Sequence, residues 1–279
     1  MSPKTIIAAS MVMLGMLAAP AFADERPQAP AADEIVKKAN HAALYQGSDV
    51  KGAVSMIITD RQGRTRKRGF NMLRKDVGAG DGDQEYYVYF NEPADVRKMS
   101  FMVHKNGDPA RDDDRWLYMP GLDLVKRIAA GDKRTSFVGS DYLYEDISGR
   151  SPLEDAHELT GTTDNCYILK NVPKEPGSVE FAYYLAHIDR KTFIPVKLEF
   201  FKKPDRLCRV IEVLKIDSME ALENGRKVLY PTVTRSVARN LDTGSKTEMT
   251  FSNVRYNIGL TDQIFTERYL RRPPKEAMR

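Results

Sequence analysis

The feature that most constrains the fold of this chain is a long series of strand-length segments separated by turn sequences. The segments are rich in β-branched and aromatic residues, and turn signals such as Arg61-Gln62-Gly63 lie between them. Five segments precede residue 121 and six follow residue 162: 50–60, 64–75, 84–92, 96–105, 114–120, 163–172, 178–189, 193–203, 208–217, 228–241 and 245–257. Because the connections are short, neighbouring strands are expected to be antiparallel. The sequence therefore predicts a mainly β fold with one sheet of about ten or eleven strands, large enough to curl or close.

Several of these segments carry aromatic residues on both sides of the predicted strand. In EYYVYFN, the side chains of Tyr86, Val88 and Phe90 share one side, and those of Tyr87 and Tyr89 share the other. A strand with one face in water would instead alternate apolar and polar residues. The middle of the sheet is therefore expected to be apolar on both faces, or to have one face covered by something other than protein.

Helical segments are few. Residues 33–46 have apolar residues at helical spacing, and Gly47 follows as a stop. The mixed segment 121–158 is the other candidate, and we expect it to act as a lid over an apolar concavity that the curled sheet leaves open. The candidate cavity residues are Tyr87, Tyr89, Phe101, Trp116, Tyr118, Tyr142, Tyr144, Phe181, Tyr183, Leu198 and Phe200. For each tyrosine, packing in the core is the alternative to contact with a ligand.

The start of the chain reads as a leader followed by a linker. Lys4 supplies a positive charge, an apolar run follows, and Ala21-Phe22-Ala23 has the small residues of a cleavage site. The apolar run is shorter than the roughly 20 residues of a spanning helix, which favours a cleaved signal peptide over an uncut anchor. The predicted organisation is a signal peptide at 1–23, a flexible linker at 24–32 and a single β domain at 33–279. The mature protein is expected to be soluble in the periplasm.

Charge and motifs argue against several functions. The 43 basic and 39 acidic residues nearly balance, whereas a nucleic-acid binder would concentrate basic residues on one face. The sequence contains no nucleophile elbow, phosphate-binding loop, dinucleotide fingerprint or zinc motif, and its four histidines are scattered. The acidic run 112–114 lacks the glycine and the terminal glutamate of an EF-hand loop, which favours a solvated loop over a calcium site. We therefore expect no enzyme activity, no metal and no cofactor.

Two further features have more than one interpretation. Cys166 and Cys208 could form one disulfide in an oxidising compartment, but they lie on separate predicted strands with other strands between them. Whether they are bonded is left open. The basic pairs Lys133-Arg134 and Arg271-Arg272 could meet anionic headgroups or a partner, or could serve solubility alone.

The segment DRWLYMPGLDLVKRIAAGDKRTSFVGSDYLYEDISGR, residues 114–150, resembles the LolA-like family of outer-membrane lipoprotein-sorting proteins. It carries W-L-Y-x-P, K-R-I, F-x-G-S-D and Y-E-D in order, and residues 189–201 and 251–270 are similar to later segments of the same family branch. The resemblance implies a strongly curved antiparallel half-barrel with helices in its concave face. One departure is the stretch 217–230, which is longer than the tight turn expected in the family.

The resemblance further implies a non-enzymatic periplasmic carrier that shields acyl chains of a lipoprotein or lipid between the inner and outer membranes. Implied partners are the acyl chains, an inner-membrane exporter and an outer-membrane acceptor; contact with the membrane would be transient, and a monomer is expected. On the residues matched to the family, we hypothesise a polar latch that holds the lid to the sheet, formed by Lys126, Arg127, Asp141, Glu145 and Asp146. The alternative is a periplasmic sensing or scaffolding module that binds a membrane protein or an exporter without carrying lipid.

Overall fold

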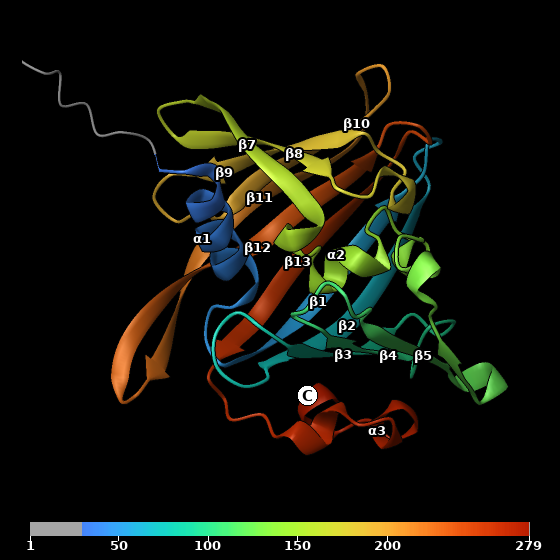
Figure 1. Ribbon diagram of the computed structural model, residues 1–279. Helices are drawn as coiled ribbons and strands as arrows, with labels where there is room; N and C mark the ends of the chain where they lie inside the picture. The colour runs from blue at the N-terminus through green and yellow to red at the C-terminus, as the bar shows by residue number, and fades with distance from the viewer. Residues whose placement is uncertain (1–29, 279) are drawn as a thin grey trace, which may run out of the picture. The chain divides into compact units, whose positions relative to one another are not determined.

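A sheet of thirteen antiparallel strands contains about half of residues 30–278, the part of the chain that this computed structural model describes (Figure 1). The strands lie in the order β6-β5-β4-β3-β2-β1-β13-β12-β11-β10-β9-β8-β7. They are β1 Asp49–Thr59, β2 Thr65–Asp76, β3 Gln84–Glu92, β4 Ser100–Lys105, β5 Asp114–Met119, β6 Leu124–Arg127, β7 Asp155–Thr162, β8 Cys166–Pro173, β9 Tyr183–Asp189, β10 Pro195–Lys202, β11 Arg206–Glu223, β12 Arg226–Asn240 and β13 Ser245–Tyr256. The predicted mainly β antiparallel fold is confirmed. The two additional strands are β6 and β7, which lie inside or overlap the segment predicted as the lid.

The sheet is strongly curved but does not close, because its edge strands β6 and β7 do not pair with each other. Interruptions of the ladder contribute to the curvature. The register of β1 shifts between Lys51 and Ala53, and that of β11 shifts between Val213 and Lys215. Such bulges bend a strand and increase its twist. The result is the half-barrel expected from the resemblance, with one concave and one outer face.

Helices are short and lie on both faces of the sheet. They are α1 Ala32–Leu44, α2 Tyr144–Ser148, α3 Arg268–Arg271 and α4 Lys275–Met278, with 3₁₀ turns η1 Pro120–Leu122, η2 Ala130–Asp132, η3 Phe137–Gly139, η4 Pro152–Glu154, η5 Pro176–Ser178 and η6 Asp262–Phe265. The helix predicted at residues 33–46 is α1, and its buried Ile35 and Ala39 pack against side chains of β8 and β9. Within residues 30–278, every helix is too short or too polar to cross a bilayer.

The C-terminal segment covers the outer face of β2 to β5 (Figure 1). Leu260, Ile264, Phe265 and Leu270 form a buried cluster there with outer-face residues such as Tyr87. The hydroxyl of Tyr87 donates to the carbonyl of Tyr269 at 2.7 Å. Both faces of this part of the sheet are therefore apolar because protein covers both. This C-terminal cover was not among the helical segments expected from the sequence.

Strands β11 and β12 continue beyond the sheet as a two-stranded arm, residues 213–234. β11 pairs with β10 only as far as Glu212, and β12 pairs with β13 only from Arg235 onward. The arm ends in a turn in which Asn224 and Gly225 both have positive φ, 50° and 76°. This backbone suits the right-handed twist of a hairpin and favours an Asn-Gly pair. The arm accounts for the long stretch 217–230 noted in the sequence.

Two sequence expectations concern the termini and the cysteines. The predicted signal peptide and most of the predicted linker fall outside the described residues. Cys166 on β8 and Cys208 on β11 are free thiols, and β9 and β10 lie between their strands. The Sγ of Cys208 donates to the carbonyl of Phe200 at 3.3 Å.

Candidate ligand cavity

A cavity of about 470 Å³ lies between the concave face of the sheet, α1 and the lid, by which we mean residues 128–154. Its volume falls within the roughly 300–1,000 Å³ of ordinary ligand pockets. Val36, Ala39 and Ala42 line it from α1, and Ile147 and Pro152 line it from the lid. Strands β1–β3 and β7–β13 all contribute lining residues, whereas β4, β5 and β6 contribute none.

The lining is apolar because alternate residues of each strand point to the same side. On β9, Tyr184, Ala186 and Ile188 face the cavity, and on β10, Leu198 and Phe200 do so. Apart from Pro195, where the register of β10 shifts, the opposite side chains of these two strands do not line the cavity. Curvature of the sheet brings these apolar rows around one space, so the cavity is a property of several strands that are distant in the sequence.

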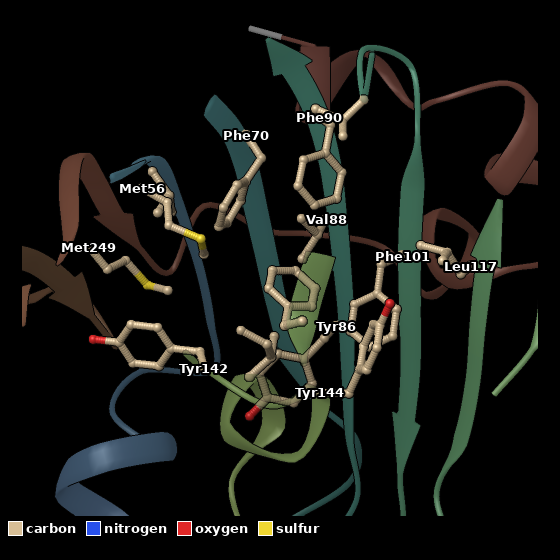
Figure 2. Packing of buried hydrophobic residues seen from close by; sticks show 14 of the residues in the cluster. Met56, Phe70, Tyr86, Val88, Phe90, Phe101, Leu117, Tyr142, Tyr144 and Met249 are labelled. Carbon is tan, nitrogen blue, oxygen red and sulfur yellow. The ribbon is translucent and has the colours of Figure 1, made fainter. Parts of the chain in front are cut away.

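The lid is packed into the concave core by its aromatic residues (Figure 2). The ring of Tyr144 lies 5.2 Å from that of Phe101 and 5.4 Å from that of Phe137, measured between centroids. The hydroxyl of Tyr142 is 2.8 Å from that of Ser236 on β12. Burial raises the pKa of the Tyr142 hydroxyl above that of an exposed tyrosine. These contacts make residues 128–154 a packed part of the fold.

Two lid carboxylates bind groups of the sheet. Asp141 accepts a hydrogen bond from the hydroxyl of Thr247 on β13 at 2.6 Å, and Ser245 also donates to it. Asp146 is ion-paired with Arg209 of β11 and accepts from the backbone N–H of Leu143 at 2.6 Å. Since β11 and β13 belong to the concave wall, these bonds connect the start of α2 directly to the cavity wall.

Glu145 is the centre of a second group of charges. Its carboxylate is ion-paired with Arg134 and lies 3.5 Å from both Lys133 and Arg150. Burial raises the pKa of Glu145, and the cationic side chains of Arg134, Arg150 and Lys133 partly offset that effect. Arg134 also donates two hydrogen bonds to Glu180, at 2.7 and 3.0 Å. Glu145 therefore holds the lid together and, through Arg134, ties it to residues beside β9.

Of the residues hypothesised to form a latch, the structure brings the three acidic ones into contact with cations or hydroxyl groups, but not with the two basic ones. Asp141, Glu145 and Asp146 all make the polar contacts just described. Lys126 and Arg127 do not reach them, because both lie on the edge strand β6, and Arg127 pairs with Asp114. The cations that meet the three carboxylates are instead Lys133, Arg134, Arg150 and Arg209.

The structure divides the eleven predicted cavity residues into three groups. Tyr142, Leu198 and Phe200 line the cavity. Phe101, Tyr144 and Phe181 are buried beside it without lining it, in the core under the lid or against Phe200. The remaining five do not face the cavity: Tyr87, Tyr89, Trp116, Tyr118 and Tyr183. The first four contact the C-terminal segment on the outer face, and Tyr183 stacks on Phe201 on the side opposite Phe200.

Some lining residues were not predicted from the sequence. Arg74 of β2 donates to the carbonyls of Gln46 and Gly47, at 3.0 and 2.6 Å, and so fixes the end of α1. The sequence pattern could have indicated that Arg74 faces the cavity, because its side chain lies on the same side of β2 as those of the apolar Phe70 and Met72. His157 and Asn171 also line the cavity and are 2.7 Å apart. Their pairing across β7 and β8 has no signature in the sequence.

The described residues offer no metal centre. No group of three histidine, cysteine, aspartate or glutamate side chains within residues 30–278 is placed to bind a metal ion. In the acidic run 112–114, Asp113 accepts from the backbone N–H of Asn106 and pairs with Arg115, while Asp114 pairs with Arg127. The run therefore supports local structure through hydrogen bonds and ion pairs.

Comparisons with known proteins agree with this architecture. A family model described as “Uncharacterized protein” matches residues 82–272, well over half of the chain. The crystal structure of a DUF1329 family protein from Desulfovibrio piger is 27% identical with a TM-score of 0.75, and the match covers 85% of this chain and 96% of that one. No curated protein sequence matches the chain.

Two further solved structures show the same fold at lower identity. A putative outer membrane lipoprotein-sorting protein domain from Vibrio parahaemolyticus is 23% identical with a TM-score of 0.73, covering 86% of this chain and 97% of that one. A LolA superfamily protein, NE2245 from Nitrosomonas europaea, is 20% identical with a TM-score of 0.61, covering 86% of this chain and all of that one. The fold is thus shared across nearly the full length of these proteins.

Proposed function

The chain belongs to a LolA-like protein family, and from that premise we propose that it is a periplasmic carrier of acyl chains. In this proposal the cavity takes up the acyl chain of a lipid or lipoprotein at the inner membrane and shields it from water until delivery to the outer membrane. The observation that carries the proposal is the apolar cavity of about 470 Å³ under α1 and the lid.

The chemistry of the cavity favours an apolar cargo. Its strand walls present Leu198, Ile211 and Val213, and burial of an acyl chain against such residues contributes about 0.8 kcal/mol per CH₂. The charged lid residues that line the cavity already have partners, as in the ion pair of Asp146 with Arg209 of β11. Carriage requires no catalytic step, and we propose none.

A carrier must also release its cargo, and here the lid has a role. A long acyl chain held in a closed apolar cavity would dissociate slowly, because its whole transfer free energy opposes release. Polar contacts that water can reach, such as the pair of Arg134 with the half-exposed Glu180, can exchange for hydrogen bonds to water when the lid moves. We propose that opening of the lid lowers the affinity for cargo at the acceptor membrane. An exporter and an acceptor protein would supply the contacts that favour opening.

The proposal is tested first by native mass spectrometry of the protein purified without detergent from its own periplasm, followed by lipid extraction. A discrete added mass that extracts as an acyl compound is the expected result. A clean apo mass with no uptake from lipid vesicles would overturn the carrier and favour a module that binds a membrane protein.

A variant that fills the cavity sharpens the test. Ala186 of β9 lines the cavity, so Ala186→Phe should reduce binding of a soluble fluorescent fatty acid at least tenfold. Ala156→Phe makes the same change at an exposed alanine of β7 outside the lining, and should bind normally. Thermal melts of both variants establish that each is folded. Equal binding by the two variants would place the ligand elsewhere.

A further inference from the structure

The corner of the sheet at β6 exposes two leucines among basic residues. Leu122 is 72% exposed and Leu124 is 45% exposed. We refer to Leu122, Leu124, Lys126, Arg271 and Arg272 as the β6 corner. Leu122 and Leu124 lie at the turn between β5 and β6, and Lys126 follows two residues further along the same strand. Since none of these residues lines the cavity, the corner is separate from the site described above.

The C-terminal segment brings two arginines to this turn. Arg271, the last residue of α3, donates through Nε to the carboxylate of Asp123 at 3.0 Å and through a second nitrogen to its carbonyl at 3.3 Å. Its guanidinium also lies over the ring of Tyr118, 5.7 Å from the centroid. Arg272 follows directly and is exposed. Residues far apart in the sequence therefore meet at one exposed corner, as the green and red segments in Figure 1 indicate.

The corner has an excess of positive charge. Its two acidic neighbours are each engaged, Asp123 with Arg271 and Asp114 with Arg127. Within residues 30–278, neither Lys126 nor Arg272 forms an ion pair. Two exposed leucines thus lie beside two cations that have no acidic partner. This combination suits an anionic surface with apolar material immediately behind it.

The arm of β11 and β12 provides an internal comparison. Leu222 and Leu229 are 63% and 64% exposed, about as much as Leu122. The arm carries as many carboxylates as cations: Lys227 pairs with Glu220 at 2.8 Å, Lys215 pairs with Asp217 at 2.9 Å, and Arg226 lies opposite Glu223 on the neighbouring strand. Exposed leucine is therefore present at both places, and an excess of positive charge distinguishes the β6 corner.

We propose that the β6 corner docks on the surface of an anionic phospholipid bilayer. Leu122 and Leu124 enter the boundary between headgroups and acyl chains, and Lys126 and Arg272 meet lipid phosphates. Two leucines and two charges give weak, reversible attachment, which suits a protein that visits two membranes. The inference deepens the proposed carrier function, because it identifies the part of the chain that meets the membrane.

The test is co-sedimentation of the purified protein with vesicles of phosphatidylcholine, with or without about one third phosphatidylglycerol. We expect binding to the anionic vesicles that weakens as salt is raised. Leu122→Asp should lower the bound fraction at least tenfold. The single variants Lys126→Gln and Arg272→Gln should each lower the affinity for anionic vesicles about fivefold, as expected for the loss of one basic residue near an anionic surface. Leu229→Asp, equally exposed in the neutral arm, is the matched control and should bind like wild type.

Several results would overturn the inference: equal binding to both vesicle types, an equal loss in Leu122→Asp and Leu229→Asp, or binding only to vesicles that contain membrane proteins of the source cell. The last would assign the corner to a protein partner. Binding of a soluble fluorescent fatty acid is measured on the same samples. A variant that loses vesicle binding but binds the fatty acid normally tests the β6 corner alone. A protein that binds vesicles but does not bind the fatty acid would contradict the proposed carrier function alone.

Discussion

Asp141 of the lid and Thr247 of β13 exchange two hydrogen bonds. The hydroxyl of Thr247 donates to the Asp141 carboxylate at 2.6 Å and accepts from the backbone N–H of Asp141 at 2.9 Å. Thr247 is fully buried. A hydroxyl buried in this way depends on its partner, because water cannot replace the lost bond. The pair is therefore a point where the position of the lid and the stability of the sheet are coupled.

The first prediction follows from that pair. Asp141→Ala should lower the free energy of unfolding by about 1–3 kcal/mol, since it leaves the buried hydroxyl of Thr247 without an acceptor. Asp141→Asn keeps an acceptor oxygen and should cost less. Urea denaturation monitored by circular dichroism measures both values. Equal losses for the two variants would mean that charge, and not the hydrogen bond to Thr247, determines the effect.

A second prediction concerns the outer face. Phe265 is 1% exposed in the cluster formed with Tyr87 and Leu270, and Phe265→Ala should lower the free energy of unfolding by about 3–5 kcal/mol. Gln263→Ala, two residues earlier and exposed, is the control and should have little effect. The single tryptophan, Trp116, packs against this cluster and supplies a fluorescence probe. A loss below about 1 kcal/mol would contradict the packing of the C-terminal segment.

The distribution of aromatic residues shows what the sequence could and could not predict. Alternation separated Tyr86 and Phe90 from Tyr87 and Tyr89 correctly, because side chains of a strand alternate between faces. It could not say which face is concave. That depends on the curvature of the whole sheet and on the C-terminal segment, whose short helices have too few turns to produce an apolar period. The chosen tyrosines 87 and 89 therefore lie on the outer face.

The lid contacts illustrate a second limit. The acidic residues Asp141, Glu145 and Asp146 could be predicted because they lie within one conspicuous segment. Their partner Arg209 is 63 positions from Asp146 and belongs to the strand opposite the lid. A single sequence carries no signal for such a pairing. Lys126 and Arg127 were chosen because they belong to the K-R-I motif matched to the family, but they lie on the edge strand β6, where Arg127 pairs with Asp114.

A third prediction uses the buried Lys105 of β4. Its ammonium donates to the carbonyl of Ser148 at 2.8 Å, and burial lowers its pKa from 10.5 to about 8. Between these two values the unfolded chain binds more protons than the native one, so the stability due to this group rises with pH. Below about pH 8 both states are protonated and the contribution of Lys105 does not vary with pH.

Comparison with Lys105→Met isolates this group from others that titrate. The free energy of unfolding of wild type, relative to that of the variant, should rise by about 2 kcal/mol between about pH 7 and pH 10. Urea denaturation at a series of pH values measures the difference. A difference that stays flat over this range would mean that Lys105 is not buried in solution, and one that falls with pH would reverse the sign of its shift.

The final prediction asks whether the lid controls access to the cavity. The side chains of Asp141 and Thr247 are in hydrogen-bond contact, so we expect cysteines at both positions to approach the Cα separation of roughly 4.4–6.8 Å that a disulfide needs. Asp141→Cys with Thr247→Cys is made in a background of Cys166→Ser and Cys208→Ser, which removes the two native thiols. Oxidation should then fix the lid to β13, and mass spectrometry of the intact protein confirms the bond.

In the oxidised protein, exchange of a bound fluorescent fatty acid should slow at least tenfold, and a reductant should restore it. The reduced double variant should exchange faster than its background, because the contacts of Asp141 with Thr247 are gone. Asp141→Cys alone in the same background controls for oxidation and for the loss of the carboxylate. If the bonded and reduced forms exchange cargo at the same rate, cargo does not pass the start of α2. The other boundary of the cavity, between α1 and the base of the arm, would then be the route of entry, since Ala42 and Pro231 line the cavity there.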